Sequence, residues 1–553
     1  MTRREAIVTI VGLFALAAAV RVVAAAAVPF AVPEDTAYYW GVARNVVEGR
    51  GLVSDALWSY FLPPLTLPRP AFEIWLPLPT FLSAPFMAVL GTSFRVAQVP
   101  GVLVSAAVPV LTWRLVADLA DERGLTGLRA RALAVGSGAV AAVYGPLVLY
   151  GALPDSTAPF TVAIVAACIL MERVARDPRG ARLLDARLLG VGIALGFAAL
   201  TRNEAIWYAL AWAGTAWLVA GHLAGDRTDA RASIRGRLAP LARLLAGPAV
   251  VAIVVYAPWA ARQWAVFGTP LPGQAVANAF SRTGTDIFAW NDRPSMGTWL
   301  AQGPAKLLAD RVDGFVHNVW TVLLLPALPV GPIGLLGLPW ILRSVVLRPL
   351  LIGAALTFLA STLLFPVSTT WGTFLHAAGP VHVLLVASAM AALDALVARV
   401  GARRGWGTGS ALLAPVAVIV FALPMLWLTV TGIGGVATDA ERRYAELART
   451  TEAAGVPLAA NAPVISDFPI WLAESARVGS LALPQESPED VLDLARTFDA
   501  RLLVVSVEPS HGAWPAILDE GGPGSECFVP VPDATVRAPD GSEELLVYRI
   551  ACR

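Results

Sequence analysis

The sequence is poor in charge, and this deficit decides its broad class. Only 15% of the 553 residues are Asp, Glu, Lys or Arg, whereas 57% are hydrophobic and the mean hydropathy is +0.65. Soluble domains carry about 25% charged residues, so an ordinary soluble protein is excluded and an integral membrane protein is predicted. Lysine occurs once, at Lys306, and the arginines are spread among separate segments. The net charge of +1 therefore gives no basic patch that would bind nucleic acid.

Several motifs that mark particular chemistries are also missing. The sequence has no H-E-x-x-H or C-x-x-C, no G-x-S-x-G and no G-x-x-x-x-G-K-[ST], so zinc protease, serine hydrolase and ATPase chemistry are disfavoured. Charged residues are nearly absent from the middle of the apolar runs, which argues against an ion-coupled transporter with a site at mid-membrane.

Cysteine is scarce. Cys168 lies inside an apolar run and is interpreted as a small buried hydrophobic residue. Cys527 and Cys552 both fall in the C-terminal part of the chain. If that part lies outside the cytoplasm, the two form a disulfide or remain two free thiols, and the sequence leaves both alternatives open.

Apolar runs of the length needed to cross a bilayer, about 20 residues, recur along the chain. They cover 5–30, 94–117, 132–152, 157–175, 186–200, 205–222, 244–266, 320–342, 349–368, 378–398 and 408–433. The first run follows Arg3 and Arg4 and is too long for a signal-peptide core, so we interpret it as an uncleaved first span. This pattern predicts an all-α polytopic membrane bundle with about eleven transmembrane helices.

Arginine placement predicts the orientation. With the N-terminus in the cytoplasm, the arginines concentrate in the cytoplasmic segments, as the positive-inside rule requires. Those segments are 1–4, 118–131, 173–187, 223–243, 343–348 and 399–407, and the outer loops are 31–93, 153–156, 201–204, 267–319 and 369–377. We therefore predict a multi-pass protein of the cell membrane with a cytoplasmic N-terminus, and an odd number of spans places the C-terminal part outside.

The first outer loop, 31–93, contains two segments of interest. Residues 73–91 are apolar enough to span, but prolines interrupt them and a span here would invert every later loop, so we expect an interfacial or re-entrant piece. A twelve-span arrangement is the alternative. Earlier in the loop, apolar residues from Tyr39 to Val47 recur at helical spacing opposite polar Arg44, Asn45 and Glu48. This pattern predicts a short amphipathic helix in the membrane interface that ends at Gly49 and Gly51.

After Gly434 the pattern changes. Residues 439–553 alternate helix-like and strand-like runs without a spanning segment. We therefore expect a transmembrane domain over 1–434 and a small extracytoplasmic α/β domain over 439–553. Within the latter, Asp467 lies beside aromatic residues, where it either contacts a sugar or packs.

Ionisable residues gather where the predicted spans meet the outer surface. They are Glu34, Asp35, Asp155, Arg202, Glu204 and His376. Such groups are costly beside a membrane unless they are paired or hydrated, so they are functional candidates. Structural explanations remain open: Asp35 and Asp155 could cap helices, and Arg202 and Glu204 could simply pair with each other. His376 could be an interfacial side chain, and His382 is expected to pack.

These features resemble those of a known enzyme family, both in their order along the chain and in the side of the membrane on which they are predicted to lie. An acid follows the first span in VPEDTAYYWGVARNVVEGRGL, and PLPTFLSAPFMAVLG, FRVAQVPGVLV, ALPDSTAPF, GFAALTRNEA and YAPWAARQWAVFGTPLP follow in turn. Over residues 1 to about 400, the chain resembles polyprenyl-phosphate-sugar-dependent glycosyltransferases of the GT-C fold, family 39 type. This type includes bacterial relatives of dolichyl-phosphate-mannose protein mannosyltransferases and the lipid A aminoarabinose transferase.

The resemblance implies a hexosyl- or pentosyltransferase that takes a sugar from a polyprenyl-phosphate donor to a hydroxyl outside the cytoplasm. It implies an outward-facing cavity with Asp35 as the catalytic carboxylate and Glu34 as its neighbour. The substrate-binding residues that it implies are Asp155, Arg202, Glu204 and His376; the last stands where the family often has an arginine. The chain lacks the long carbohydrate-binding insertion of the eukaryotic mannosyltransferases, so the acceptor is a carbohydrate, a lipid or a protein.

The chemistry of such a transfer needs few groups. A polyprenyl phosphate leaves without a general acid, so one carboxylate that takes the acceptor proton suffices, whereas glycosidases use two. We predict Asp35 as this base and Arg202 as the cation for the leaving phosphate, with Asp155 and Glu204 orienting the acceptor or Arg202. No metal is required, although a divalent cation between Asp35 and Asp155 would be compatible with the sequence. The alternative functions are a transporter or flippase for a lipid-linked or wall precursor, and an inactive scaffold.

Overall fold

A computed structural model describes residues 2–178, 185–225, 234–272, 277–507 and 513–552 of the chain. Within these residues, six helical segments are long and apolar enough to cross a membrane. They include α1 (Arg3–Ala27), α4 (Phe94–Ser105) continued by α5 (Ala107–Glu122), α8 (Thr157–Arg176), α11 (Ile234–Phe267), α19 (Gly379–Arg404) and α20 (Leu413–Ala453). The chain is therefore a multi-pass membrane protein built mainly of helices. Parts of the predicted cytoplasmic segments 173–187 and 223–243 lie outside the described residues.

The remaining predicted spans coincide with other helices, most of them shorter or interrupted, whereas α10 (Ala205–Gly225) is a single helix of 21 residues. The others are α6 (Gly127–Val143) followed by α7 (Gly145–Leu149), α9 (Ala186–Ala199), η3 (Asn318–Leu324) followed by α15 (Val330–Ile341), and α16 (Arg348–Leu363). The break after α6 has a local cause, because Pro146 lacks an N–H for the preceding turn. The fully buried Arg21 donates hydrogen bonds to the carbonyls of Ala142 and Leu147, on the two sides of this break. It thereby satisfies groups that a membrane interior would leave unpaired.

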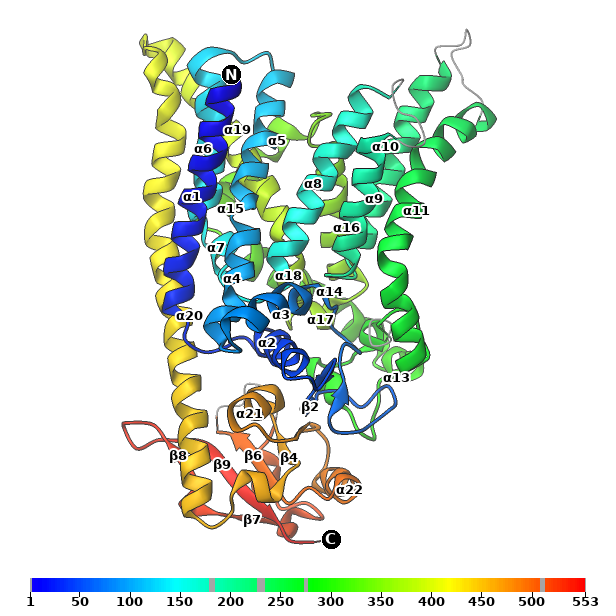
Figure 1. Cartoon of the computed structure of the whole chain (residues 1–553), viewed down its shortest axis with the longest axis vertical. Helices are drawn as coiled ribbons and strands as arrows, with labels where there is room; N and C mark the ends of the chain where they lie inside the picture. The colour runs from blue at the N-terminus through cyan, green and yellow to red at the C-terminus, as the bar shows by residue number, and fades with distance from the viewer. Residues whose placement is uncertain (1, 179–184, 226–233, 273–276, 508–512, 553) are drawn as a thin grey trace.

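The first outer loop forms a layer across one end of the bundle, where α2 (Glu34–Val47) and α3 (Leu78–Leu90) lie crosswise to the long helices (Figure 1). Helix α3 has 13 residues, fewer than a span needs, and it packs against α2 and α4. This agrees with the expectation that 73–91 is not a full span.

Helix α2 forms where the sequence predicts it, but its polar side is not solvated. Arg44 and Asn45 are buried. The Arg44 guanidinium makes an ion pair of 2.5 Å with Glu474 of the C-terminal part, and the Asn45 amide donates to the carbonyl of Val53. The C-terminal part therefore covers the face that amphipathicity alone assigns to the aqueous side of a membrane interface.

A small α/β unit follows the bundle. Its sheet has the order β2-β5-β4-β6-β9-β7, with β8 paired to β9. The strands are β2 (Ala56–Leu57), β4 (Val464–Ser466), β5 (Ser480–Ala482), β6 (Leu502–Ser506), β7 (Phe528–Pro530), β8 (Val536–Arg537) and β9 (Glu543–Ile550), and the main helices are α21 (Pro469–Ala476) and α22 (Pro488–Phe498). Strand β2 comes from the first outer loop and pairs in parallel with β5. The loop that carries Glu34 and Asp35 is thus joined to the C-terminal sheet.

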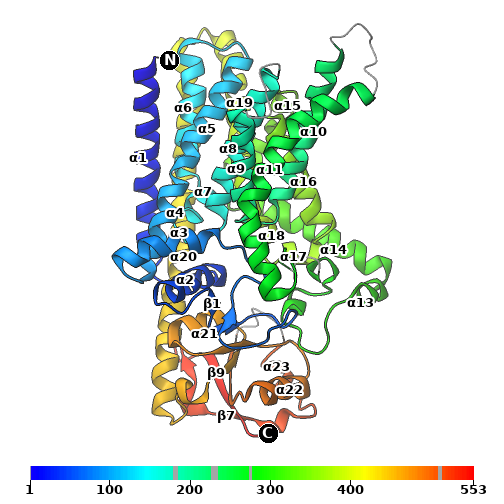
Figure 2. The same ribbon diagram turned by 45° about the vertical axis from the view of Figure 1, so that its right-hand side comes forward.

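Two further features tie this unit together. Helix α20 is one continuous helix of 41 residues, about 60 Å long, and it runs from the bundle into the α/β unit (Figures 1 and 2). The predicted limit near residue 434 therefore falls inside one helix. Cys527 and Cys552 form a disulfide, which decides between the two alternatives for these thiols.

Candidate active site

A cavity of about 450 Å³ lies where the bundle, the first outer loop and the C-terminal unit meet. It is lined by the start of α2, the loop before α10, the segment 278–288 and the short helices α17 (Pro366–Thr369) and α18 (Thr373–Ala377). Phe468 and Trp471 of the C-terminal unit complete its wall. The predicted site residues at the cavity surface are Glu34, Asp35, Arg202, Glu204 and His376, and Asp155 lies directly behind His376.

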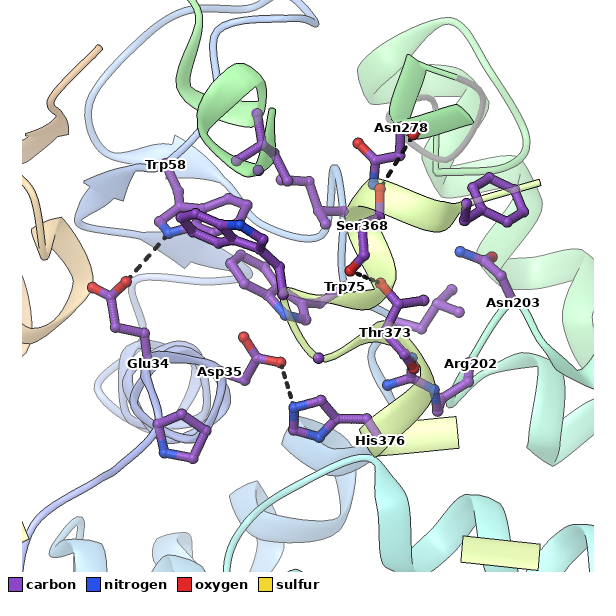
Figure 3. A pocket seen from close by; sticks show the side chains of 18 of the residues that line it. Glu34, Asp35, Trp58, Trp75, Arg202, Asn203, Asn278, Ser368, Thr373 and His376 are labelled. Atoms are coloured by element: carbon purple, nitrogen blue, oxygen red, sulfur yellow. Dashed lines mark hydrogen bonds and ion pairs between the residues drawn. The ribbon is translucent and has the colours of Figure 1, made fainter. Parts of the chain in front are cut away.

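Asp35 and His376 face each other across the cavity floor (Figure 3). Asp35 lies in the first turn of α2, where the helix dipole favours a negative charge. Its side chain is 28% exposed, and its Oδ2 atom lies 3.6 Å from Nε2 of His376. The carboxylate is therefore accessible to a substrate in the cavity while it is oriented by an imidazole.

Asp155 holds the other side of the same imidazole. Its Oδ2 atom lies 3.2 Å from Nδ1 of His376, and its side chain is fully buried. Its Oδ1 atom accepts a hydrogen bond of 2.7 Å from the backbone N–H of Thr157 at the start of α8. The N-cap residue of α8 is Ser156, so Asp155 is not the N-cap itself, but its carboxylate accepts from the first N–H of the helix and also belongs to the polar cluster.

The three groups shift one another's pKa. Burial raises the pKa of Asp35 above its ordinary range, and the charge of His376 opposes that shift. Burial acts in the same direction on Asp155, but His376 and the Thr157 hydrogen bonds outweigh it and hold the pKa of Asp155 low. Burial disfavours the imidazolium, yet the charge of Asp155 raises the pKa of His376 above its ordinary value. The geometry thus favours an ionised Asp155 beside a protonated His376.

Arg202 and Glu204 pair with each other at the cavity wall. The guanidinium donates two hydrogen bonds to the Glu204 carboxylate, at 3.1 and 2.8 Å. It also donates to Ser156 Oγ at 3.0 Å and to the carbonyl of Thr373 at 3.1 Å. These contacts fix a cation beside Asp35, close enough for its charge to lower the pKa of that carboxylate.

Glu34 points away from this cluster, toward the C-terminal unit (Figure 3). Its Oε1 atom accepts hydrogen bonds from the backbone N–H groups of Ile470 and Trp471 in the first turn of α21, at 3.0 and 3.4 Å. Its Oε2 atom accepts from the indole of Trp58 at 3.5 Å. The two adjacent acids thus have different surroundings: Asp35 faces the cavity floor, and Glu34 links the first outer loop to α21.

A cation between Asp35 and Asp155 does not fit the arrangement. The His376 imidazole already occupies the space between the two carboxylates. In the described part of the chain, no group of three or more His, Cys, Asp or Glu side chains is placed to hold a metal ion.

Sequence reasoning pointed to the aromatic residues beside Asp467 but missed the rest of the aromatic part of the cavity. The rings of the cavity include Trp58, Trp75, Phe288, Trp371, Phe468 and Trp471, beside Tyr39, Trp207 and Phe365. Asp467 itself is buried in the C-terminal unit, where it accepts a hydrogen bond of 2.9 Å from the N–H of Ser506, but its neighbours Phe468 and Trp471 reach the cavity. His382 is buried in the bundle against the Tyr144 hydroxyl, as expected for packing. A Trp beside a candidate loop is the only sequence signal that could have found these rings.

No protein-family model matches the sequence, and no curated protein matches it. Solved structures do match. ArnT from Cupriavidus metallidurans bound to undecaprenyl phosphate is 16% identical, with 97% of each chain covered and a TM-score of 0.51. The archaeal oligosaccharyltransferase AglB from Archaeoglobus fulgidus is 13% identical, with 98% of this chain and 74% of that chain covered and a TM-score of 0.49.

The chain has the GT-C fold. At this low identity the likeness concerns the fold, and the expectation of the family 39 branch remains a prediction.

Proposed function

We propose that this protein is a membrane glycosyltransferase that moves a sugar from a polyprenyl-phosphate donor to an acceptor hydroxyl, with Asp35 as the general base. The observation that carries the proposal is the convergence of Asp35, His376 and Arg202 on one cavity at the end of the membrane bundle. These residues come from three segments that are far apart in sequence, and each carries a group suited to one part of the reaction.

In the proposed step, the acceptor oxygen attacks the anomeric carbon of the donor sugar. The bond between that carbon and the phosphate oxygen breaks, and its electron pair stays with the phosphate. The proton of the acceptor hydroxyl passes to a carboxylate oxygen of Asp35. The raised pKa of Asp35 makes its carboxylate a stronger base than that of an ordinary aspartate.

The cations beside Asp35 suit the departing phosphate. Arg202 presents a guanidinium held by Glu204, Ser156 and Thr373, and guanidinium groups match phosphate oxygens well. We assign Glu204 to orienting Arg202 and Asp155 to orienting His376. His376 in turn positions Asp35, and its imidazolium adds positive charge near the developing phosphate.

The membrane side of the cavity supports the proposed donor class. Ile206 and Trp207 of α10 and Phe365 beside α16 line it with apolar surface, which suits the first isoprene units of a polyprenyl chain. ArnT, which shares the fold, binds undecaprenyl phosphate. We extend this ligand class, and the family 39 type, to the present chain. The other partners are membrane lipids and a carbohydrate, lipid or protein acceptor.

The disulfide supports the proposed orientation. The chain's N-terminus and its C-terminal unit lie at opposite ends of the molecule (Figure 1). The Cys527–Cys552 disulfide belongs to the C-terminal end, and disulfides persist in oxidising compartments outside the cytoplasm. We therefore place the N-terminus in the cytoplasm and the cavity with the C-terminal unit on the outer side.

The test is a turnover assay. Purified protein is incubated in lipid nanodiscs with radiolabelled undecaprenyl-phosphate sugars, and the proposal expects transfer to added envelope material or slow hydrolysis of the donor. Movement of intact donor across a sealed vesicle membrane, without any cleavage of the sugar–phosphate bond, would support a flippase and contradict the proposal.

A further inference from the structure

Four aromatic side chains form a continuous wall on one side of the cavity, here called the aromatic wall: Trp58, Trp75, Phe288 and Trp371. The ring centroids of Trp58 and Trp75 are 4.8 Å apart, those of Trp58 and Phe288 are 4.9 Å apart, and those of Phe288 and Trp371 are 5.8 Å apart. The first outer loop supplies two of these rings, the segment before α13 (Met296–Ala301) supplies the third, and the turn before α18 supplies the fourth. Three separate segments therefore build one surface.

At the outer end of the wall, Trp371 is partly exposed, and the backbone beside it leaves room for its ring. Trp371 is 39% exposed although it lines the cavity. Its indole lies directly against Gly284, where an added Cβ would overlap the ring. Only glycine leaves this space, so the backbone at residue 284 supports the position of Trp371.

The inner end of the wall meets the proposed base. The Trp75 indole lies close enough to the Asp35 carboxylate to lower its pKa against the effect of burial, and so favours its charged form. Trp58 and Trp75 lie on one side of Asp35, and His376 and Arg202 lie on the other (Figure 3). A molecule on the wall would thus approach Asp35 from the side opposite the cations proposed for the phosphate.

The chemistry of the wall suits a sugar ring. A pyranose or furanose ring has an apolar C–H face and a rim of hydroxyls, and the negative face of an aromatic ring attracts polarised C–H groups. Asn278, at the cavity edge, has a side-chain amide that makes no hydrogen bond within the described residues, so it can serve a hydroxyl. An extended peptide is bound mainly through a row of main-chain hydrogen bonds, whereas this wall offers aromatic rings. The wall therefore favours a sugar over an extended peptide.

We propose that the aromatic wall binds a sugar ring of the acceptor, so that the acceptor is a carbohydrate. This inference rests on the proposed function, because it takes Asp35 as the base that the bound hydroxyl must reach. It assigns Trp371 as a specificity-determining residue and Trp75 as the ring nearest to the reaction.

Direct binding tests the inference. Saturation-transfer NMR measures the binding of soluble disaccharides of glucose, galactose, mannose and arabinose to the full-length protein in nanodiscs without glycosylated detergent. At least one disaccharide is expected to bind the wild type. Trp371→Ala should weaken that binding about tenfold, Gly284→Ala should weaken it similarly by displacing the indole, and Trp371→Phe should restore most of it.

The matched control is Trp406→Ala. Trp406 is 41% exposed, close to the 39% of Trp371, and it lies outside the cavity after α19. This variant should bind the disaccharide like the wild type. Loss of binding in Trp406→Ala would show that the effect is not specific to the wall.

A second probe separates this inference from the proposed function. Undecaprenyl phosphate alone should bind the wild type and Trp371→Ala equally well. If it does not bind the wild type, the proposed function fails. If it binds normally but no disaccharide binds, or Trp371→Ala binds the disaccharide unchanged, the inference about the acceptor is wrong. If Trp371→Ala binds an undecaprenyl-phosphate sugar more weakly than the wild type does, the wall belongs to the donor sugar. If the wild type binds a serine-containing peptide and Trp371→Ala does not, the wall belongs to a protein acceptor. Either result overturns the inference.

Discussion

His376 presents its Nε2 atom to Asp35 at 3.6 Å, and its Nδ1 atom is held by Asp155. One imidazole thus connects a buried, ionised carboxylate to a carboxylate that faces the cavity. Because the charge of His376 lowers the pKa of Asp35 against the effect of burial, this contact sets the pH above which Asp35 can act as a base.

Replacing His376 should shift the pH dependence of the reaction. Without the imidazolium, the pKa of Asp35 rises further, so the acidic limb of the kcat/KM profile should move to higher pH in His376→Gln. The measurement is sugar transfer as a function of pH. An acidic limb that stays in place, or that moves to lower pH, would show that His376 does not control Asp35.

Replacing Arg202 should weaken binding of the donor. The loss of a charged hydrogen-bond donor to the phosphate should reduce affinity for undecaprenyl phosphate by about tenfold to a hundredfold in Arg202→Ala, and Arg202→Lys should recover only part of it because lysine lacks the planar fork. Filter binding of the radiolabelled lipid provides the measurement. Arg449→Ala is the control, since that side chain is 72% exposed and lies outside the cavity. Equal affinity in Arg202→Ala and Arg449→Ala would remove Arg202 from the phosphate site.

Glu34 should make the docking of the C-terminal unit sensitive to pH. Burial raises its pKa in the folded protein to about 8, whereas in the unfolded chain it titrates near its ordinary value of about 4.3. As pH rises between these two values, the unfolded state loses the proton first, so the contribution of Glu34 to folding stability falls.

In Glu34→Gln this pH-dependent loss of folding stability is absent, because glutamine does not titrate. The amide oxygen of the glutamine can still accept a hydrogen bond from the N–H of Ile470. The Tm of the variant relative to the wild type should therefore rise as pH increases from about 4.3 to about 8, and then level off. Thermal unfolding of the two proteins at several pH values measures it, and the other titrating groups cancel in the comparison. A difference in Tm that shrinks as pH rises would contradict the assigned contact.

The disulfide predicts a thiol count. The chain has three cysteines, and Cys527 and Cys552 are joined, so the denatured protein should alkylate at Cys168 alone before reduction and at all three after it. Reduction should also destabilise the C-terminal unit by about 3.5 kcal/mol, the value expected when a disulfide joins residues 25 positions apart. Mass spectrometry of the alkylated protein checks the count. Three reactive thiols without reductant, in protein taken from its membrane, would argue against an oxidising compartment.

Much of the bundle could be predicted from sequence because each span carries its own signal. An apolar run such as 378–398 predicts a membrane helix by length and composition, and α19 forms there. The polar cluster could be predicted as well, because the side of the membrane on which a loop emerges follows from counting spans. Asp35, Asp155 and His376 were therefore expected on one surface, and the structure brings them into contact.

What the sequence could not show depends on contacts between distant segments. The two residues of β2 have no pattern that predicts pairing with β5, more than 400 positions later. Arg44 resembles a solvated residue on an amphipathic helix until its partner Glu474 is known. The same holds for Glu34, which is adjacent to Asp35 in sequence but accepts a hydrogen bond from the backbone of α21. Tryptophans at loop positions look like interfacial anchors, so the aromatic wall could be recognised only in three dimensions.

The role of Asp35 is tested most directly by sugar transfer in Asp35→Asn. The substitution keeps the size of the side chain and removes the base, so kcat should fall by about a hundredfold or more while undecaprenyl phosphate still binds. Asp499→Asn, at a 69% exposed carboxylate outside the cavity, should transfer sugar at the wild-type rate. Near-normal transfer in Asp35→Asn would contradict the account.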